Sequence, residues 1–335
     1  MKRIISLLLA LALSLSLAAC AAPAEKADGG KLQIVTTLFP YYDFARAIAQ
    51  DRADVTLLLS PGREAHSFEP TPLDAVTISE ADVFLYNGGE GEYWVESMLD
   101  AAGENIAVVA RMMDYVDALN EEYVEGMQGA DDHDHDHEHG SHDDHDHDHE
   151  EDEHDSDEIE YDEHIWTSPK NAVVLCRAVC DAICRADAEN AAFYRANCEN
   201  YCAQLEDLDA RFAALCESAP RRLLIFADRF PMLYFCREYG LDYRAAFHGC
   251  SGDTEPSLAT IKFLIDKVED ENIPVVYTID FGTKKVAAVV SECTDAAIDT
   301  LYSMQTVSRA DFDAGETYLT LMERNFEALR KGLNA

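Results

Sequence analysis

Basic residues are scarce in this chain. Its 335 residues include 26 Lys and Arg against 65 Asp and Glu, which leaves a formal net charge of −39 at pH 7. Proteins that hold nucleic-acid phosphates do so with Lys and Arg, so this composition excludes that class of partner. The hydrophobic share of 48% is ordinary for a globular protein and excludes a wholly disordered chain. The length predicts two lobes, at about 100 to 200 residues per domain.

Long hydrophobic runs are lacking beyond the amino terminus. The run from Ile4 to Ala19 follows Lys2 and Arg3, which is the pattern of an export signal, and it is shorter than the roughly 20 residues that span a bilayer. It ends in Leu17-Ala18-Ala19-Cys20, which resembles a bacterial lipobox. We therefore expect residues 1–20 to be a lipoprotein signal with Cys20 lipidated, and residues 21–30 to be a tether. The protein would then be exported and anchored on the extracytoplasmic face of the bacterial cell membrane; an ordinary cleavage site is the alternative.

Common catalytic signatures are missing as well. The chain has no HExxH motif, no GxSxG nucleophile elbow and no P-loop. A zinc hydrolase would need an open metal position and a general base, for which Glu64 or Glu163 could be nominated. We expect a binding protein and not an enzyme.

One internal block has neither basic residues nor a hydrophobic pattern. Residues 131–163 contain 19 acidic residues and nine histidines, so residues 131–158 are expected to form a disordered loop. Closely spaced imidazoles offer many two- or three-ligand arrangements, which predicts weak, multiple zinc binding. The histidines concerned are His133, His135, His137, His139, His142, His145, His147, His149 and His154.

The cysteines do not suggest a disulfide framework, because nine remain after Cys20 and nine is odd. Cys176, Cys180 and Cys184 recur every four residues, as do Cys198 and Cys202, so each set lies on one face of a predicted helix. Small buried hydrophobic side chains are the favoured interpretation. A cysteine-only zinc site is the weaker one, because paired CxxC knuckles are missing.

The hydrophobic pattern alternates between strands and helices, which predicts an α/β fold. Expected strands are Leu32–Thr36, Val55–Leu59, Asp82–Tyr86, Ile106–Val109, Leu223–Ala227, Asp242–Phe247 and Val275–Ile279. Expected helices are Tyr42–Asp51, one starting at the Ser168-Pro169 cap, Pro231–Tyr239, Ser257–Asn272, Lys285–Thr294 and Ala314–Leu333. A stretch over 187–218 has no internal Gly or Pro and predicts a long helix between lobes at 31–186 and 219–335.

Polar side chains follow several predicted strands. His66, Asp228, His248 and Asp280 lie beyond carboxyl ends of strands, where open α/β sheets bind ligands, and His164 lies just before the Ser168 cap. Imidazole nitrogens with a carboxylate oxygen form the ligand set that Zn²⁺ accepts, whereas Mn²⁺ favours more oxygen. The pattern therefore predicts a metal site between the two lobes.

Two segments carry a specific resemblance. Pro61-Gly62-Arg63-Glu64-Ala65-His66-Ser67-Phe68-Glu69-Pro70 resembles the PGxDPHxYEP motif of the zinc and manganese solute-binding lipoproteins of bacterial ABC transporters (cluster A-I). Tyr161-Asp162-Glu163-His164-Ile165-Trp166-Thr167-Ser168-Pro169 is similar to their DPHxWLSP motif, and the histidine-rich loop between the two is typical of zinc-selective members. Gly252-Asp253-Thr254-Glu255-Pro256-Ser257 is akin to a later EPS segment of that family.

The resemblance implies a fold of two α/β lobes tied by a long rigid helix, with the metal in the cleft between them. It also implies a monomer that captures Zn²⁺, in preference to Mn²⁺, and delivers it to an ABC permease with its ATPase. His66 and His164 carry over as ligands. A surface adhesin or zinc-buffering protein remains the alternative, with a zinc hydrolase behind it.

The chain departs from the family at the other two ligands. The usual third His falls on Ala227, and the usual fourth carboxylate falls at 302–305, where none is present. Asp228 is the first substitute because it adjoins the family position, and His248 is the second. Asp280 and Cys250 follow as lesser candidates.

Overall fold

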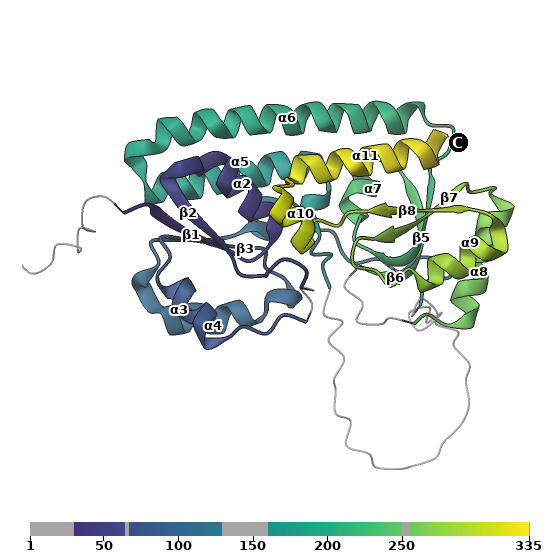
Figure 1. Ribbon diagram of the computed structural model, residues 1–335, viewed down its shortest axis with the longest axis horizontal. Coiled ribbons are helices and arrows are strands. Elements are labelled where there is room, and N and C mark those ends of the chain that lie inside the picture. The colour runs from purple at the N-terminus through teal and green to yellow at the C-terminus, as the bar shows by residue number, and fades with distance from the viewer. Residues whose placement is uncertain (1–29, 64–66, 129–159, 250–254, 335) are drawn as a thin grey trace, which may run out of the picture.

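The structure, a computed structural model, describes residues 30–63, 67–128, 160–249 and 255–334. Within these residues the chain forms two lobes, each built on a four-stranded parallel sheet, with one long helix running along both (Figure 1). This confirms the predicted fold class. Cys20, His66, Cys250 and the nine loop histidines lie outside the described residues.

The first sheet has the strand order β2-β1-β3-β4 and the second has the order β6-β5-β7-β8. The first consists of β1 (Leu32–Thr36), β2 (Ala53–Leu57), β3 (Val83–Tyr86) and β4 (Val108–Arg111). The second consists of β5 (Leu223–Phe230), β6 (Asp242–His248), β7 (Val275–Ile279) and β8 (Ala297–Leu301). Because both sheets are parallel, all strand carboxyl ends of one lobe meet at one edge.

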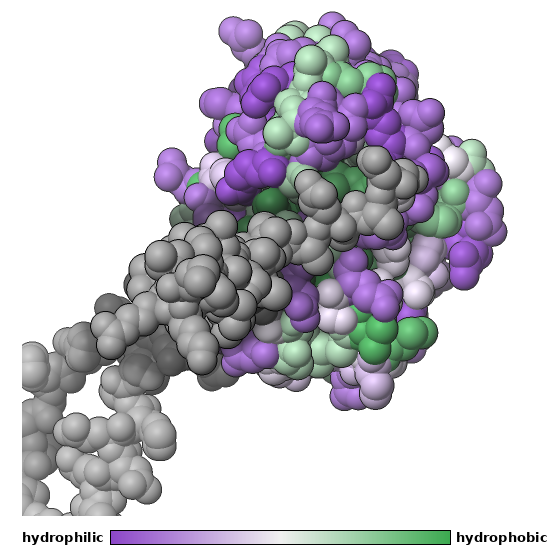
Figure 2. Space-filling model, turned by 90° about the vertical axis from the view of Figure 1, so that its left-hand side faces the viewer, coloured by the Kyte–Doolittle hydropathy of each residue, from purple (hydrophilic) through white to green (hydrophobic). Residues whose placement is uncertain are grey.

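Helices lie on both faces of each sheet (Figure 1). The first lobe carries α2 (Phe39–Ala49), α3 (Pro72–Ser79), α4 (Trp94–Ala102) and α5 (Pro169–Ala186). The second carries α7 (Leu233–Tyr239), α8 (Leu258–Asp270), α9 (Lys285–Thr294), α10 (Arg309–Ala314) and α11 (Tyr318–Asn334). The end of the molecule that the first lobe forms shows hydrophilic areas interrupted by hydrophobic patches (Figure 2).

The long helix α6 (Ala191–Ser218) has 28 residues and is therefore about 42 Å long. Its buried side chains recur at helical spacing and face α2 and α5 of the first lobe and α7 and α11 of the second. Phe212 is fully buried and contacts the rings of Phe235, Tyr239 and Phe326. Burial against both lobes thus holds a helix that is amphipathic along its whole length.

A buried carboxylate joins three of these helices. One oxygen of Asp43 in α2 accepts hydrogen bonds from the Tyr201 hydroxyl of α6 at 2.6 Å and from the backbone N–H of Tyr318 in α11 at 3.0 Å. Burial raises the pKa of Asp43, although these hydrogen bonds oppose the rise. The lobes are therefore connected by polar bonds as well as by apolar packing.

Several predicted elements differ from the observed ones at their ends. The predicted helix over 187–218 begins only at Ala191, because the Asp187 carboxylate accepts the Asn190 N–H and caps a short 3₁₀ turn before it. The second strand runs from Ala53 and not from Val55. Strand β8 was not predicted, because its half-exposed sequence AIDTL carries no buried run.

Asp228 is the most important correction. It was expected just after a strand ending at Ala227, yet β5 continues to Phe230 and Asp228 lies inside it. The pairing of β5 with β6 shifts register between Phe226 and Arg229, which is the irregularity that admits a charged residue there.

Among the described residues, no helix is long and apolar enough to cross a membrane.

Phe212→Ala should lower the free energy of unfolding by about 3 to 5 kcal/mol, because it leaves a cavity where three aromatic rings meet. Urea denaturation would measure this. Gln204→Ala, at an exposed position of the same helix, is the control and should change stability by less than about 0.5 kcal/mol. Equal effects of the two substitutions would contradict the role given to α6.

Candidate metal centre

His164 is buried at the junction of the two lobes, with 1% of its surface exposed. It follows a short β-bridge between Asn120 and Tyr161 and precedes the 3₁₀ turn Ile165–Thr167. The Ser168 hydroxyl then accepts the Asn171 N–H and starts α5, with Pro169 at the first helical position, as the sequence predicted. The ring therefore sits on a short segment that is fixed at both ends.

Asp162 orients the imidazole of His164. One carboxylate oxygen accepts the backbone N–H of His164 at 2.8 Å and lies 3.2 Å from its ring Nδ1. Ligand histidines are commonly held this way through one nitrogen while the other binds metal. Burial lowers the pKa of His164, but the charges and hydrogen bond of Asp162 and the charge of Glu163 outweigh burial and raise it overall. Protons therefore compete with metal for this ring.

Both lobes hold the segment around His164. The Asn87 amide of the first lobe donates to the backbone oxygen of Glu163 at 3.0 Å. From the second lobe, the Tyr234 hydroxyl donates to the backbone oxygen of Asp162 at 2.7 Å. Trp166 donates from its indole to the Ser303 oxygen at 2.7 Å, and the Tyr318 hydroxyl donates to the Trp166 oxygen at 2.6 Å. A change in the angle between the lobes would thus act directly on this segment.

His248 ends strand β6 on the same side of the molecule. Its Nδ1 lies 2.9 Å from a carboxylate oxygen of the buried Glu121, and its ring contacts Tyr123. A side chain on the next residue, Gly249, would come within 2.9 Å of the His164 ring, so the backbone after His248 passes close to that ring. Glu121 also raises the pKa of His164 through its charge. His164, His248 and Glu121 therefore share one region.

Sequence reasoning did not find Glu121. Its position follows from contacts between the segments on either side of the histidine-rich loop. Asn120 forms a β-bridge with Tyr161, and the Glu121 N–H donates to the Glu160 oxygen at 2.9 Å. No local pattern around Glu121 predicts that pairing.

Asp228 and Asp280 have their own neighbours around the end of β7. A side chain on Gly282 would overlap the Asp228 carboxylate, so that group lies against the loop after β7. A carboxylate oxygen of Asp280 accepts a hydrogen bond from the Ser303 N–H at 3.1 Å. Asp280 also lines a separate pocket together with Lys284 and Asp311. Burial raises the pKa of Asp280 to about 6.

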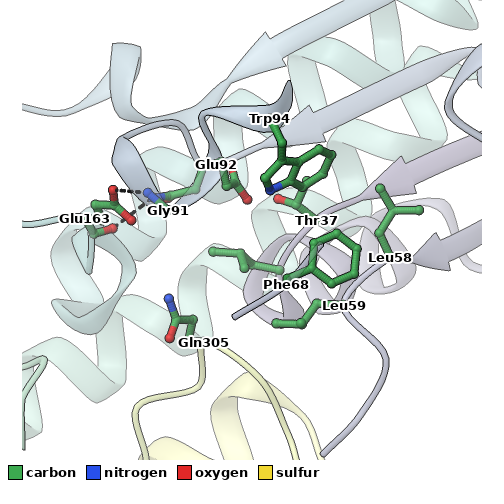
Figure 3. Close-up of a pocket in the computed structure, with 11 residues that line it drawn as sticks. Thr37, Leu58, Leu59, Phe68, Gly91, Glu92, Trp94, Glu163 and Gln305 are labelled. Carbon is green, nitrogen blue, oxygen red and sulfur yellow. Dashed lines mark hydrogen bonds between the residues drawn. The ribbon is translucent and has the colours of Figure 1, made fainter. Parts of the chain in front are cut away.

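A small pocket lined by Glu163, the residue before His164, lies where the carboxyl ends of the first sheet meet the second lobe (Figure 3). It is lined by Thr37, Leu38, Leu58, Leu59, Phe68, Asn87, Gly91, Glu92, Trp94, Glu163 and Gln305. Glu163 accepts the Gly91 N–H at 2.8 Å, and Glu92 accepts the Gly88 N–H at 2.8 Å. Burial raises the pKa of Glu92 to about 7, and the charge of Glu163 adds to the rise.

Comparison with known proteins identifies the family. The family model described as ZnuA, zinc-uptake complex component A periplasmic, matches residues 34–332. The chain belongs to this family. It is 31% identical over 305 residues to the high-affinity zinc uptake system protein ZnuA of Bacillus subtilis, covering 91% of this chain and 88% of that protein.

A further relative is streptococcal, and the structure of one of its domains is known. The zinc-binding lipoprotein AdcA of Streptococcus pneumoniae is 30% identical over 332 residues, and the chain spans 61% of its length. The crystal structure of the Zn(II)-bound ZnuA-like domain of that protein matches with a TM-score of 0.71 and 26% identity, over 91% of this chain and all of that domain. The similarity thus extends across both lobes.

For this member of the ZnuA family, the described residues hold only part of the predicted ligand set. His164, Asp228 and His248 do not form a group in which all three ligand atoms lie within 4.8 Å of one another. Within the described ranges, the one group of three or more such residues consists of cysteines. Ala227 is buried in β5 and supplies no ligand, and Gln305 lines the pocket near the family's usual fourth position. His66 and Cys250 lie outside the described residues.

In metal-free protein, the stability of the Glu92→Gln variant relative to the unmutated protein should increase as pH rises from 5 to 8. The pKa of Glu92 rises from 4.5 to about 7, so the folded state keeps a proton that the unfolded state loses. Its contribution to stability is therefore full below pH 4.5 and is lost through pH 7, by up to about 3 kcal/mol. Urea unfolding at several pH values would measure this. Exposed Glu96→Gln should show no such trend.

Proposed function

We propose that the chain is the extracytoplasmic zinc-binding component of an ABC importer. It captures Zn²⁺, which is the transported substrate, between its two lobes and delivers the ion to a membrane permease that works with an ATPase. Membership of the ZnuA family and the buried, Asp162-oriented His164 at the lobe junction support this proposal. We further propose that the protein acts as a monomer, anchored through Cys20, and performs no chemical conversion.

The proposed ligand set begins with His66 and His164. Asp228 and His248 are the candidates for the remaining positions, ahead of Asp280 and Cys250. The approach of Gly249 to the His164 ring supports His248, which lies on β6. The Asp228 carboxylate instead contacts Gly282 on the loop after β7, and β5 separates β6 from β7 in the sheet. Imidazoles with one carboxylate suit Zn²⁺ better than Mn²⁺, which prefers oxygen donors.

Release requires that zinc affinity differ between two arrangements of the lobes. The segment around His164 is bonded to Asn87 of one lobe and Tyr234 of the other, so a small rotation between lobes would shift His164 relative to ligands on the second sheet. The continuous α6 packs on both lobes and favours such small shifts over wide opening.

No described geometry favours a hydrolase. Glu163, nominated as a general base, uses a carboxylate oxygen to accept the Gly91 N–H and so fixes the pocket loop. A surface adhesin or zinc buffer would differ by working without a permease.

In protein that starts at Ala21 and lacks residues 131–158, His164→Ala should abolish tight zinc binding at the lobe junction and so lower the number of tightly bound zinc ions by one. Asp162→Asn should weaken it about 10- to 100-fold, because it removes the group that orients the ring. Competitive zinc titration would measure both. The variants Asp228→Ala, His248→Ala and Asp280→Asn identify the further ligand, because only loss of a ligand lowers the zinc affinity. Asp270→Asn, at the exposed end of α8, is the control. An unchanged number of tightly bound zinc ions in His164→Ala would refute the cleft site.

Deleting residues 131–158 should slow zinc uptake only when zinc is limiting, because the loop gathers metal weakly. Cells that carry the full or the shortened chain would be compared by ⁶⁵Zn uptake at low and at saturating zinc. Equal uptake at limiting zinc would remove this role, whereas loss of uptake at saturating zinc would show that the loop acts in the transport step itself.

A further inference from the structure

Five cysteines face one another between α5 and α6. Cys176, Cys180 and Cys184 lie on α5, and Cys198 and Cys202 lie on α6. All five are buried, with at most 7% of their surface exposed. The two helices run side by side (Figure 1) and pack closely, so the two cysteine faces predicted from the sequence meet.

The sulfur atoms are grouped at the spacing of a metal site. The Sγ atoms of Cys176, Cys198 and Cys202 all lie within 4.8 Å of one another, and the Cys198 and Cys202 sulfurs are 3.8 Å apart. Tetrahedral zinc with sulfur bonds of about 2.3 Å places its sulfurs about 3.8 Å apart. Zinc therefore fits between the two helices with only small shifts of the side chains.

A fourth sulfur lies next to this trio. The Cys180 side chain interacts with Cys198, and its sulfur is 3.9 Å from that of Cys184. Cys180 is thus the nearest further sulfur donor, and structural zinc sites are closed by four ligands. The CxxC spacing of zinc knuckles is not needed here, because the α-helical i, i+4 repeat already places two sulfurs of one helix side by side.

Charge favours a divalent ion over a monovalent one. Four thiolates with Zn²⁺ leave a net charge of −2, whereas with Cu⁺ they would leave −3, and buried uncompensated charge is costly. Arg177 follows Cys176 on α5, and its guanidinium attracts the Cys198 and Cys202 thiolates. This arginine also bonds Glu206 at 3.0 Å, which holds it over the helix pair.

We propose that Cys176, Cys198 and Cys202, with Cys180 as the fourth donor, form a closed thiolate site for Zn²⁺ that clips α5 to α6. This zinc is structural, not transported, and the site is separate from the lobe junction. Metal ligation also explains how a cluster of thiols persists in an exported protein, because bound thiolates are protected from oxidation.

The test uses Co²⁺ as the probe in reduced protein starting at Ala21. One equivalent should give the intense sulfur-to-cobalt charge-transfer absorption that only thiolate ligands produce, and Zn²⁺ should remove it. Cys198→Ala and Cys176→Ala should lose this absorption. Cys216→Ala is the matched control, since Cys216 is equally buried on α6 outside the cluster.

His164→Ala and Cys250→Ala should retain the absorption, which separates this site from the proposed transport site. Zinc X-ray absorption of unmutated protein loaded with two equivalents of Zn²⁺ provides a readout that does not depend on a variant folding, and it should show sulfur neighbours for one of the two ions. Nitrogen and oxygen neighbours alone would overturn the proposal. So would absorption that survives Cys198→Ala, binding of Cu⁺ but not Zn²⁺, or a Cys176–Cys198 or Cys176–Cys202 disulfide in protein from its own cells.

Discussion

The packing of α6 against both lobes is the constraint on which the rest of the structure depends. This helix of 28 residues buries side chains along its whole length, and helices of both lobes pack against it. The hydrophobic core of each lobe therefore includes part of the same helix. The Asp43 carboxylate reinforces this by joining α2, α6 and α11 through two hydrogen bonds. The two parallel sheets are thereby held with their strand carboxyl ends toward the lobe junction, where Gln305 of the second lobe reaches the pocket of the first.

The segment around His164 occupies that junction and belongs to neither lobe alone. Its backbone is held by Asn87, Tyr234 and Tyr318, which come from both lobes. Acidic groups are concentrated around this segment. Electrostatic interactions connect His164 with Asp162, Glu163 and Glu121, and connect Glu163 with Glu92. Such a concentration of carboxylates attracts a divalent cation and raises the pKa values of neighbouring groups, so metal affinity and proton uptake are coupled there.

Two kinds of metal chemistry fit two kinds of surroundings in this chain. Imidazole and carboxylate groups at a junction between lobes suit an ion that must enter and leave, because a small movement changes their separation. Thiolates between two packed helices suit an ion that stays, because the ligands cannot separate without breaking the helix pair.

The sequence by itself determined the α/β class, the long helix and the position of His164, because each depends on local order along the chain. Hydrophobic periodicity placed β1, β7 and α9 at the observed bounds, and Ser168-Pro169 marked the start of α5. Only the tertiary structure decided that β5 runs past Asp228, that Glu121 lies beside His248, and that two cysteine faces meet. These facts depend on strand register and on contacts between segments far apart in the chain, for which the sequence around each residue carries no signal.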